Sequence, residues 1–152
     1  FHFALDDADG AALLALLHAH GMASDRRDFG VWPRLNGLMN GKIDLIVRVD
    51  GRAFVIDYKS NYLPDYDEAS LQRAMAAHEY DLQALLYAVA VHRWLRLRLG
   101  GEYRFERHFG GVRYLFCRGL DPRNPQGGVI TPALPRELIE GADGLLSNGR
   151  RE

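Results

Sequence analysis

The chain has 152 residues, of which 47% are hydrophobic and 26% are charged, and its formal net charge is −1. This length and composition predict one globular domain with a real core, and the charge gives no sign of a uniformly basic nucleic-acid binder. A single cysteine, Cys117, excludes an intrachain disulfide and an all-cysteine metal site, and it fits a reducing compartment. No apolar run approaches the roughly 18 residues of a membrane helix.

The first forty residues predict a strand, a helix and a turn-rich segment. We expect a strand over residues 1–5 and a helix from Gly10 to about His20, capped by the preceding aspartates and stopped by Gly21. His18 and His20 fall in its last turn, where a cation suits the helix dipole; metal ligation is the alternative. Residues 29–33 suggest an extended segment, and the Asn-Gly pairs at 36–37 and 40–41 suggest turns.

The strongest local signal is an Asp-Gly dipeptide at positions 50 and 51, between two β-branched runs over residues 44–49 and 52–58. Both central residues of a type I′ turn need a positive φ, so this pattern predicts a β-hairpin. With a two-residue loop, Val49 pairs with Arg52, and Asp44 falls opposite Asp57. Opposed residues of an antiparallel pair have Cβ atoms roughly 4.5–5.5 Å apart.

The hairpin therefore predicts a metal site. Lys59 shares a face with Asp57 because side chains alternate with period two. Opposed carboxylates destabilise a sheet; a cation would remove that penalty, and Lys59 alone would cancel only part of it. We expect Asp44, Asp57 and the carbonyl of Tyr58 to hold Mg²⁺, with Lys59 orienting or deprotonating a water or stabilising phosphate charge. The alternative is a strand-start aspartate and a solvated Asp-Lys pair.

The rest of the chain predicts further helices and strands. A loop over residues 60–67 precedes either one bent helix over 68–99 or two helices with a break near 77–79. Strands are expected over 102–108 and 112–117, a polar loop over 121–128, a helix over 136–146, and a frayed tail over 147–152. These elements predict an α/β layer fold within one domain spanning 1–152, with no internal boundary.

A second constellation lies on the long helix, where Tyr80, Gln83 and Tyr87 follow i, i+3, i+7 spacing and share a face. On a helical wheel, the same inward face also holds Ala76, Leu86, Ala90 and Trp94. The opposite face largely holds Ala84, Ala88 and His92. Gln83 and Tyr87 are candidates to contact the DNA backbone or the attacking water. The alternative is that Gln83 bonds a backbone carbonyl and the tyrosines are core. Arg93, Arg96 and Arg98 suggest a solvated helix end or, less simply, a nucleic-acid patch.

Three motifs occur in order: Gly-Lys-Ile-Asp ending at Asp44, Asp-Tyr-Lys-Ser-Asn beginning at Asp57, and Tyr-Asp-Leu-Gln-Ala-Leu-Leu-Tyr beginning at Tyr80. In this order they resemble the nuclease motifs of the RecB subfamily of PD-(D/E)xK nucleases, and the likeness runs over about residues 30–128. It implies a restriction-endonuclease-like fold, in which helices flank a mixed central β-sheet, and a Mg²⁺-dependent DNA exo- and endonuclease.

The resemblance also implies a context. Relatives of this kind work in the cytoplasm within a larger ATP-binding helicase–nuclease of DNA repair and recombination. It cuts single DNA strands from the unwound duplex, has RecC and RecD as partner subunits, and is implicated in loading RecA. In the subfamily a histidine on a helix upstream of the first aspartate supplies another metal ligand. Only 43 residues precede Asp44 and that helix is not recognisable. We therefore expect a partial domain, and the role does not pass to His18 or His20.

Two other functions stay open. The first is a stand-alone DNA nuclease of the same superfamily, such as a restriction-type enzyme; a relative with a four-cysteine iron–sulfur cluster is excluded by the single Cys117. The second is an inactive module that binds DNA or partner subunits. The intact Asp44, Asp57 and Lys59 argue against it for the parent protein, whereas the missing upstream histidine leaves it open for this chain.

Overall fold

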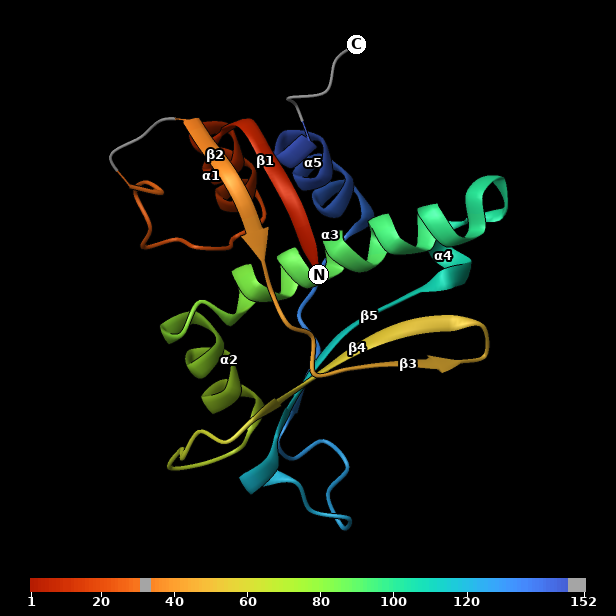
Figure 1. Cartoon of the computed structure of the whole chain (residues 1–152). Coiled ribbons are helices and arrows are strands. Elements are labelled where there is room, and N and C mark those ends of the chain that lie inside the picture. The colour runs from red at the N-terminus through yellow and green to blue at the C-terminus, as the bar shows by residue number, and fades with distance from the viewer. Residues whose placement is uncertain (31–33, 148–152) are drawn as a thin grey trace. The chain divides into compact units, whose positions relative to one another are not determined.

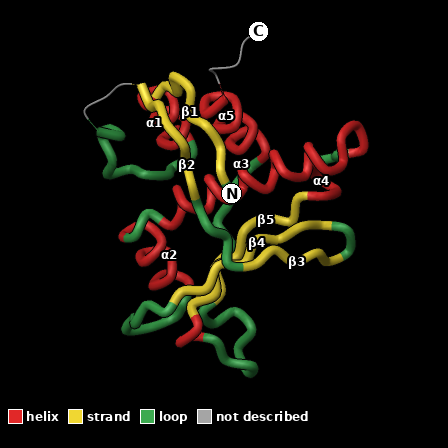
Figure 2. Tube along the Cα trace, viewed as in Figure 1, coloured by secondary structure: helices red, strands yellow, loops and turns green. Residues whose placement is uncertain are grey.

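The computed structural model describes residues 1–30 and 34–147, and it divides the chain into two compact units. One unit consists of Phe1–Lys42 and Leu134–Glu152, and the other of Ile43–Ala133 (Figures 1 and 2). Every residue of the predicted hairpin and of the long-helix constellation belongs to the second unit. Nowhere in the described ranges is there a helix long and apolar enough to cross a membrane.

The first unit pairs two antiparallel strands, β1 (His2–Asp9) and β2 (Arg34–Asn40), with helices α1 (Gly10–Ala19) and α5 (Arg136–Ser147). Helix α1 begins as predicted, because the Asp9 carboxylate accepts a hydrogen bond from the Ala12 amide at 3.0 Å. It ends before Gly21, whose φ is +70°. His18 Nε2 lies 3.1 Å from two carbonyl oxygens, those of Ala23 and Arg26, and so ties down the turn after the helix.

Three predictions for this unit were wrong. The Asn-Gly pair at 36–37 is not a turn, since it lies within β2, where Gly37 pairs with Leu5 and absorbs a φ of +143°. The pair at 40–41 is not a turn either, because Asn40 is the last residue of β2 and pairs with His2. The first strand continues beyond residue 5 to Asp9, past an irregularity between Leu5 and Ala8. The extended segment predicted at 29–33 lies partly, and the tail predicted at 147–152 almost wholly, outside the described residues.

The second unit is built on a four-stranded mixed sheet in the order β3-β4-β5-β6. Strands β3 (Leu45–Val49) and β4 (Arg52–Lys59) form an antiparallel hairpin. β5 (Phe109–Phe116) runs parallel to β4, and β6 (Val129–Ile130) pairs antiparallel with β5. Parallel strands need a long crossover connection, and the one between β4 and β5 is largely helical; its longest helix, α3 (Tyr80–Leu99), packs against both strands. The mixed sheet flanked by helices is the predicted α/β architecture.

The predicted helix over 68–99 is in fact two helices, α2 (Glu68–Ala77) and α3 (Tyr80–Leu99). Asp67 caps α2 by accepting from the Ser70 amide at 2.8 Å. The break falls at His78 and Glu79, and Glu79 has a left-handed φ of +52°, which a side chain other than glycine adopts at a cost. The two-helix alternative is thus correct.

The prediction of which residues form the inward face of α3 was partly wrong. Trp94 is 40% exposed, whereas Ala84, Ala88 and His92 are buried. The buried surface of α3 is wider than one stripe because small side chains at 84 and 88 let neighbouring elements approach closely, and because His92 packs edge-on against Tyr103.

The segment after α3 also departs from prediction. Residues 102–108 form no strand: a 3-10 turn, η1 (Gly100–Glu102), leads into the short helix α4 (Phe105–His108), where the His108 amide bonds the Arg104 carbonyl at 2.9 Å. A second 3-10 turn, η2 (Cys117–Gly119), follows β5. The short strand β6 was not predicted.

Candidate active site

The hairpin forms with the predicted two-residue turn. Asp50 and Gly51 have φ values of +50° and +80°, and Val49 pairs with Arg52. The ladder ends at the Leu45–Ile56 pair, one step short of Asp44 and Asp57. The exposed Asp44 reaches across to the neighbouring strand, where its Oδ2 accepts a hydrogen bond from the Tyr58 amide at 3.0 Å.

Asp57 and Lys59 make a buried ion pair on the helix-covered face of β4. Asp57 is 3% exposed, and its Oδ2 lies 2.7 Å from Lys59 Nζ. That approach is outside hydrogen-bond geometry, so Oδ2 has a charge partner but no hydrogen-bond donor among the described residues. The other oxygen, Oδ1, accepts from the Tyr87 hydroxyl at 3.2 Å. Asp57 is therefore held at both oxygens, by the Tyr87 hydroxyl at Oδ1 and by the Lys59 ammonium at Oδ2.

Gln83 is the second anchor of the lysine. Its Oε1 accepts a hydrogen bond from Lys59 Nζ at 2.9 Å, and an ammonium can only donate, so the amide must present its oxygen here. The same oxygen lies 3.1 Å from the Tyr114 hydroxyl, which also lies 2.9 Å from the Tyr80 carbonyl. Both neighbours are acceptors, so the single Tyr114 proton is shared between them. The Gln83 amide is thereby fixed from two directions.

Aromatic rings enclose the lysine head. Lys59 Nζ lies 3.9 Å from the centre of the Tyr80 ring and 5.0 Å from that of Tyr114, and the two rings stack 5.7 Å apart. Their faces stabilise the ammonium by cation–π attraction. Burial, followed by the negative charge of Asp57, raises the pKa of Tyr114 well above its usual value. The same causes raise the pKa of Tyr87, to which the charge of Asp44 also contributes. Both phenols stay protonated donors at neutral pH.

The structure thus brings together most of the predicted residues and adds others. Asp57, Lys59, Gln83 and Tyr87 share one network, while Asp44 and Tyr58 meet at its edge. Sequence reasoning missed Tyr114, which lies beside Asp57 in the parallel β4–β5 register. One signal was available, since Tyr114 is a hydroxyl-bearing residue in a mostly apolar strand.

Asn61, the last residue of the Asp-Tyr-Lys-Ser-Asn motif, also belongs to this region. Its Oδ1 accepts from the Tyr80 hydroxyl at 3.2 Å, and its Nδ2 lies 3.2 Å from His78 Nε2. Asn61 therefore connects the loop after Lys59 to the break between α2 and α3.

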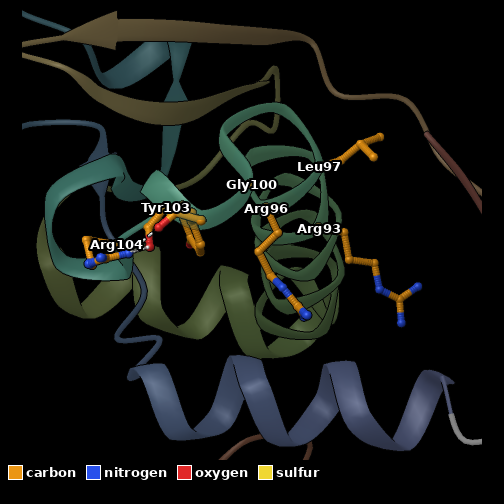
Figure 3. Close-up of a pocket in the computed structure, with 7 residues that line it drawn as sticks. Arg93, Arg96, Leu97, Gly100, Tyr103 and Arg104 are labelled. Atoms are coloured by element: carbon orange, nitrogen blue, oxygen red, sulfur yellow. Dashed lines mark hydrogen bonds between the residues drawn. The ribbon is translucent and has the colours of Figure 1, made fainter.

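A surface pocket of the second unit has a lining separate from this network. It has a volume of about 660 Å³ and is lined by the C-terminal end of α3 and the turn that follows, with Arg93, Arg96 and Arg104 among its residues (Figure 3). Arg104 Nη1 donates to the carbonyls of Gly101 and Tyr103, both at 2.8 Å. Arg98 lies over the Trp94 ring at 5.8 Å. None of the predicted catalytic residues lines this pocket.

Among residues 1–30 and 34–147, no group of three or more His, Cys, Asp or Glu side chains is placed to hold a metal ion. The predicted ligands are the carboxylates of Asp44 and Asp57 and the backbone carbonyl of Tyr58, the residue whose amide donates to Asp44. This all-oxygen set suits a hard divalent cation such as Mg²⁺ rather than a softer metal. The buried Asp57 Oδ2, which has the Lys59 ammonium beside it but no hydrogen-bond donor among the described residues, fits such a ligand.

A family model described as the PD-(D/E)XK nuclease superfamily matches residues 11–144. The chain belongs to the PD-(D/E)XK nuclease superfamily. Membership confirms the predicted nuclease fold, and nucleases of this superfamily generally depend on a divalent metal.

The chain is also similar to curated proteins named RecBCD enzyme subunit RecB. That of Escherichia coli (strain K12) is 49% identical over 118 residues, covering 75% of this chain and 10% of that protein. The protein of Haemophilus influenzae is 38% identical over 131 residues, which cover 84% of this chain and 10% of that protein. One from Mycobacterium tuberculosis (strain CDC 1551) is 41% identical over 127 residues, covering 76% and 12%. The chain spans about a tenth of the length of these relatives.

Proposed function

We propose that this chain is a nuclease domain that hydrolyses phosphodiester bonds of DNA with the help of Mg²⁺. The observation that carries the proposal is the buried Asp57–Lys59 pair, which is locked by Gln83 inside a chain of the PD-(D/E)XK superfamily. A buried pair held this tightly is costly to build for stability alone, because desolvation offsets most of its attraction.

We assign the metal to the carboxylates of Asp44 and Asp57 and the carbonyl of Tyr58. A bound Mg²⁺ would lower the pKa of a water and neutralise charge that develops on the phosphate. Asp57 supplies an oxygen that has no hydrogen-bond donor, and Asp44 supplies a carboxylate that solvent can reach. The Asp44–Tyr58 hydrogen bond fixes the Asp44 side chain beside the carbonyl-bearing residue.

Lys59 is the catalytic lysine in this proposal. The Gln83 oxygen and the Tyr80 ring hold its ammonium within the network, where it orients the attacking water or stabilises charge on the phosphate. Gln83 and Tyr87 are assigned to the same site: Gln83 orients Lys59, and the Tyr87 hydroxyl donates a hydrogen bond to Asp57. Gln83 and Tyr87, which were predicted to contact the DNA backbone or the attacking water, are therefore also proposed to position the Asp57–Lys59 pair.

The wider context is proposed from the relatives named RecBCD enzyme subunit RecB. We propose that both units act as one nuclease domain of a RecBCD-type enzyme of DNA repair and recombination in the cytoplasm. In that setting the substrate is single-stranded DNA from an unwound duplex, RecC and RecD are partner subunits, RecA is loaded nearby, and helicase and ATP-binding activities belong to the larger protein.

The decisive experiment replaces Asp57 with alanine in the full protein that carries this chain. We expect Mg²⁺-dependent cleavage of single-stranded DNA to be lost, while ATP-driven unwinding is retained. Asp25→Ala, which replaces an exposed aspartate of the first unit, serves as a matched control that should cleave normally. Persistent digestion by Asp57→Ala would sink the assignment.

A further inference from the structure

We infer that Tyr62 and His78 form a stacking site for unpaired nucleobases of the DNA strand that enters the candidate active site. This inference rests on the proposed function and names the part of the substrate that the site recognises. The two rings come from the loop after β4 and from the break between α2 and α3.

Tyr62 is an exposed aromatic side chain on a rigidly held backbone. Its exposed fraction is 83%. The hydroxyl of Tyr66 donates to the Asn61 carbonyl at 3.0 Å and accepts from the Leu63 amide at 3.2 Å, so the chain is fixed on both sides of Tyr62. A single exposed aromatic residue is ordinary. One displayed from an ordered backbone binds with a smaller loss of conformational entropy.

His78 is the exposed end of a stack of three rings. Its ring lies 5.1 Å from that of Tyr80 with an interplanar angle of 23°, and Tyr80 stacks in turn on Tyr114 at 5.7 Å and 15°. The Asn61 side chain lies 3.2 Å from His78 Nε2 and holds the imidazole in place. The left-handed Glu79 that follows is a strained position of the kind that clusters at functional sites.

Both residues are connected to the surroundings of the catalytic lysine, His78 through the Tyr80 ring and Tyr62 through the chain that follows Lys59. The Tyr80 ring stacks with His78, and its centre lies 3.9 Å from Lys59 Nζ, so the imidazole and the ammonium share this ring as a neighbour. Tyr62 follows Lys59 by three residues, and Asn61 joins its loop to His78. A strand whose bases rest on these rings would have its phosphates near Lys59.

Stacking explains how such a site would choose its substrate. Every base has a flat π-face, so stacking on aromatic residues is tolerant of sequence. Bases in a duplex are already paired and stacked, and must be unstacked before they can be bound in this way. The net charge of −1 offers no broad basic surface, so contacts to bases can supply affinity that phosphates alone would not.

The test is a binding measurement by fluorescence anisotropy on the full chain, in chelator so that no cleavage occurs. The probes are an oligothymidine strand, the matching duplex, and an abasic strand with the same number of phosphates. We expect Tyr62→Ala to weaken binding of oligothymidine about tenfold or more, and Tyr62→Phe to restore it. The abasic strand should bind weakly and equally to wild type and Tyr62→Ala. His78→Ala should give a loss of similar size.

Several outcomes would overturn the inference. They are unchanged affinity in Tyr62→Ala, an equal loss on the abasic strand, an equal loss in the matched exposed-aromatic control Trp94→Ala, and no measurable binding of oligothymidine by wild type. The proposed function fails separately: base-dependent binding by a wild-type protein that cannot cleave with Mg²⁺ would refute catalysis and leave the stacking site standing. Because Tyr62 is exposed, its replacement should leave thermal unfolding unchanged, which separates a binding defect from misfolding.

Discussion

The Asp57–Lys59 pair should be strongly coupled in the folded protein, and this can be measured without any activity assay. The two side chains are 5% and 11% exposed, and their charged atoms lie 2.7 Å apart. Removing one partner of a buried pair leaves an uncompensated charge and typically costs about 3–5 kcal/mol. Replacing both partners by uncharged groups can be nearly neutral, because neither charge is then desolvated.

The two single substitutions should not cost the same. In Lys59→Met, the Asp57 carboxylate keeps the Tyr87 hydroxyl and loses its charge partner, so we expect the full cost of about 3–5 kcal/mol. In Asp57→Asn, the ammonium keeps the Gln83 oxygen and the Tyr80 ring, so the loss should be smaller, about 1–3 kcal/mol. The double variant should recover most of the stability, which gives a coupling energy of about 2 kcal/mol or more.

The assay is urea unfolding in chelator, followed by circular dichroism, for wild type, both single variants and the double variant. The matched control is the exposed Asp121–Arg123 pair, whose atoms are 2.9 Å apart but whose arginine is 90% exposed; it should show no measurable coupling. Additive effects of Asp57→Asn and Lys59→Met, within about 0.5 kcal/mol, would refute the buried pair.

Three further predictions concern other parts of the second unit. Gln83→Ala should lower the cleavage rate constant at least tenfold with a much smaller effect on thermal stability; normal turnover with a large drop in melting temperature would make Gln83 structural. Because the pKa values of Tyr87 and Tyr114 are raised in the folded state, the unfolded chain releases protons first above about pH 10, so stability should fall as pH rises beyond that value. Urea unfolding at pH 9 and 11 checks this, and Phe at both positions should flatten the dependence. Gly119→Ala should destabilise the protein, because the added Cβ would overlap the Tyr66 ring, and a melting temperature equal to wild type would contradict that packing.

Local sequence patterns were enough to predict the centre of the site. A positive φ is required at both residues of an Asp-Gly turn, so the register of the hairpin and the shared face of Asp57 and Lys59 follow from counting. Helical spacing likewise placed Gln83 on a face that can reach the lysine. In both cases the relevant neighbours are close in sequence or separated by a single turn.

Non-local pairing was out of reach for the same reasoning. Tyr114 joins the network because β5 lies parallel to β4 and places Tyr114 beside Asp57. Parallel strands are joined by a long crossover, so no short sequence pattern predicts which residues pair. Residues 102–108 alternate in a way that suggests a strand, yet Arg104 and His108 close a helical turn through local hydrogen bonds. The pattern describes which residues prefer burial, and it does not say which partner buries them.

The arrangement of charges at the hairpin also differs from the prediction, which placed the carboxylates of Asp44 and Asp57 directly opposite each other. Opposed carboxylates would need a cation to be tolerated, but Asp44 remains exposed and bonds the Tyr58 amide, while Asp57 is neutralised by Lys59. Asp57 therefore has a charge partner two residues along its own strand. The lysine that shares a strand face with Asp57 thus supplies a charge partner at the position where the opposed carboxylates alone would have suggested a metal ion.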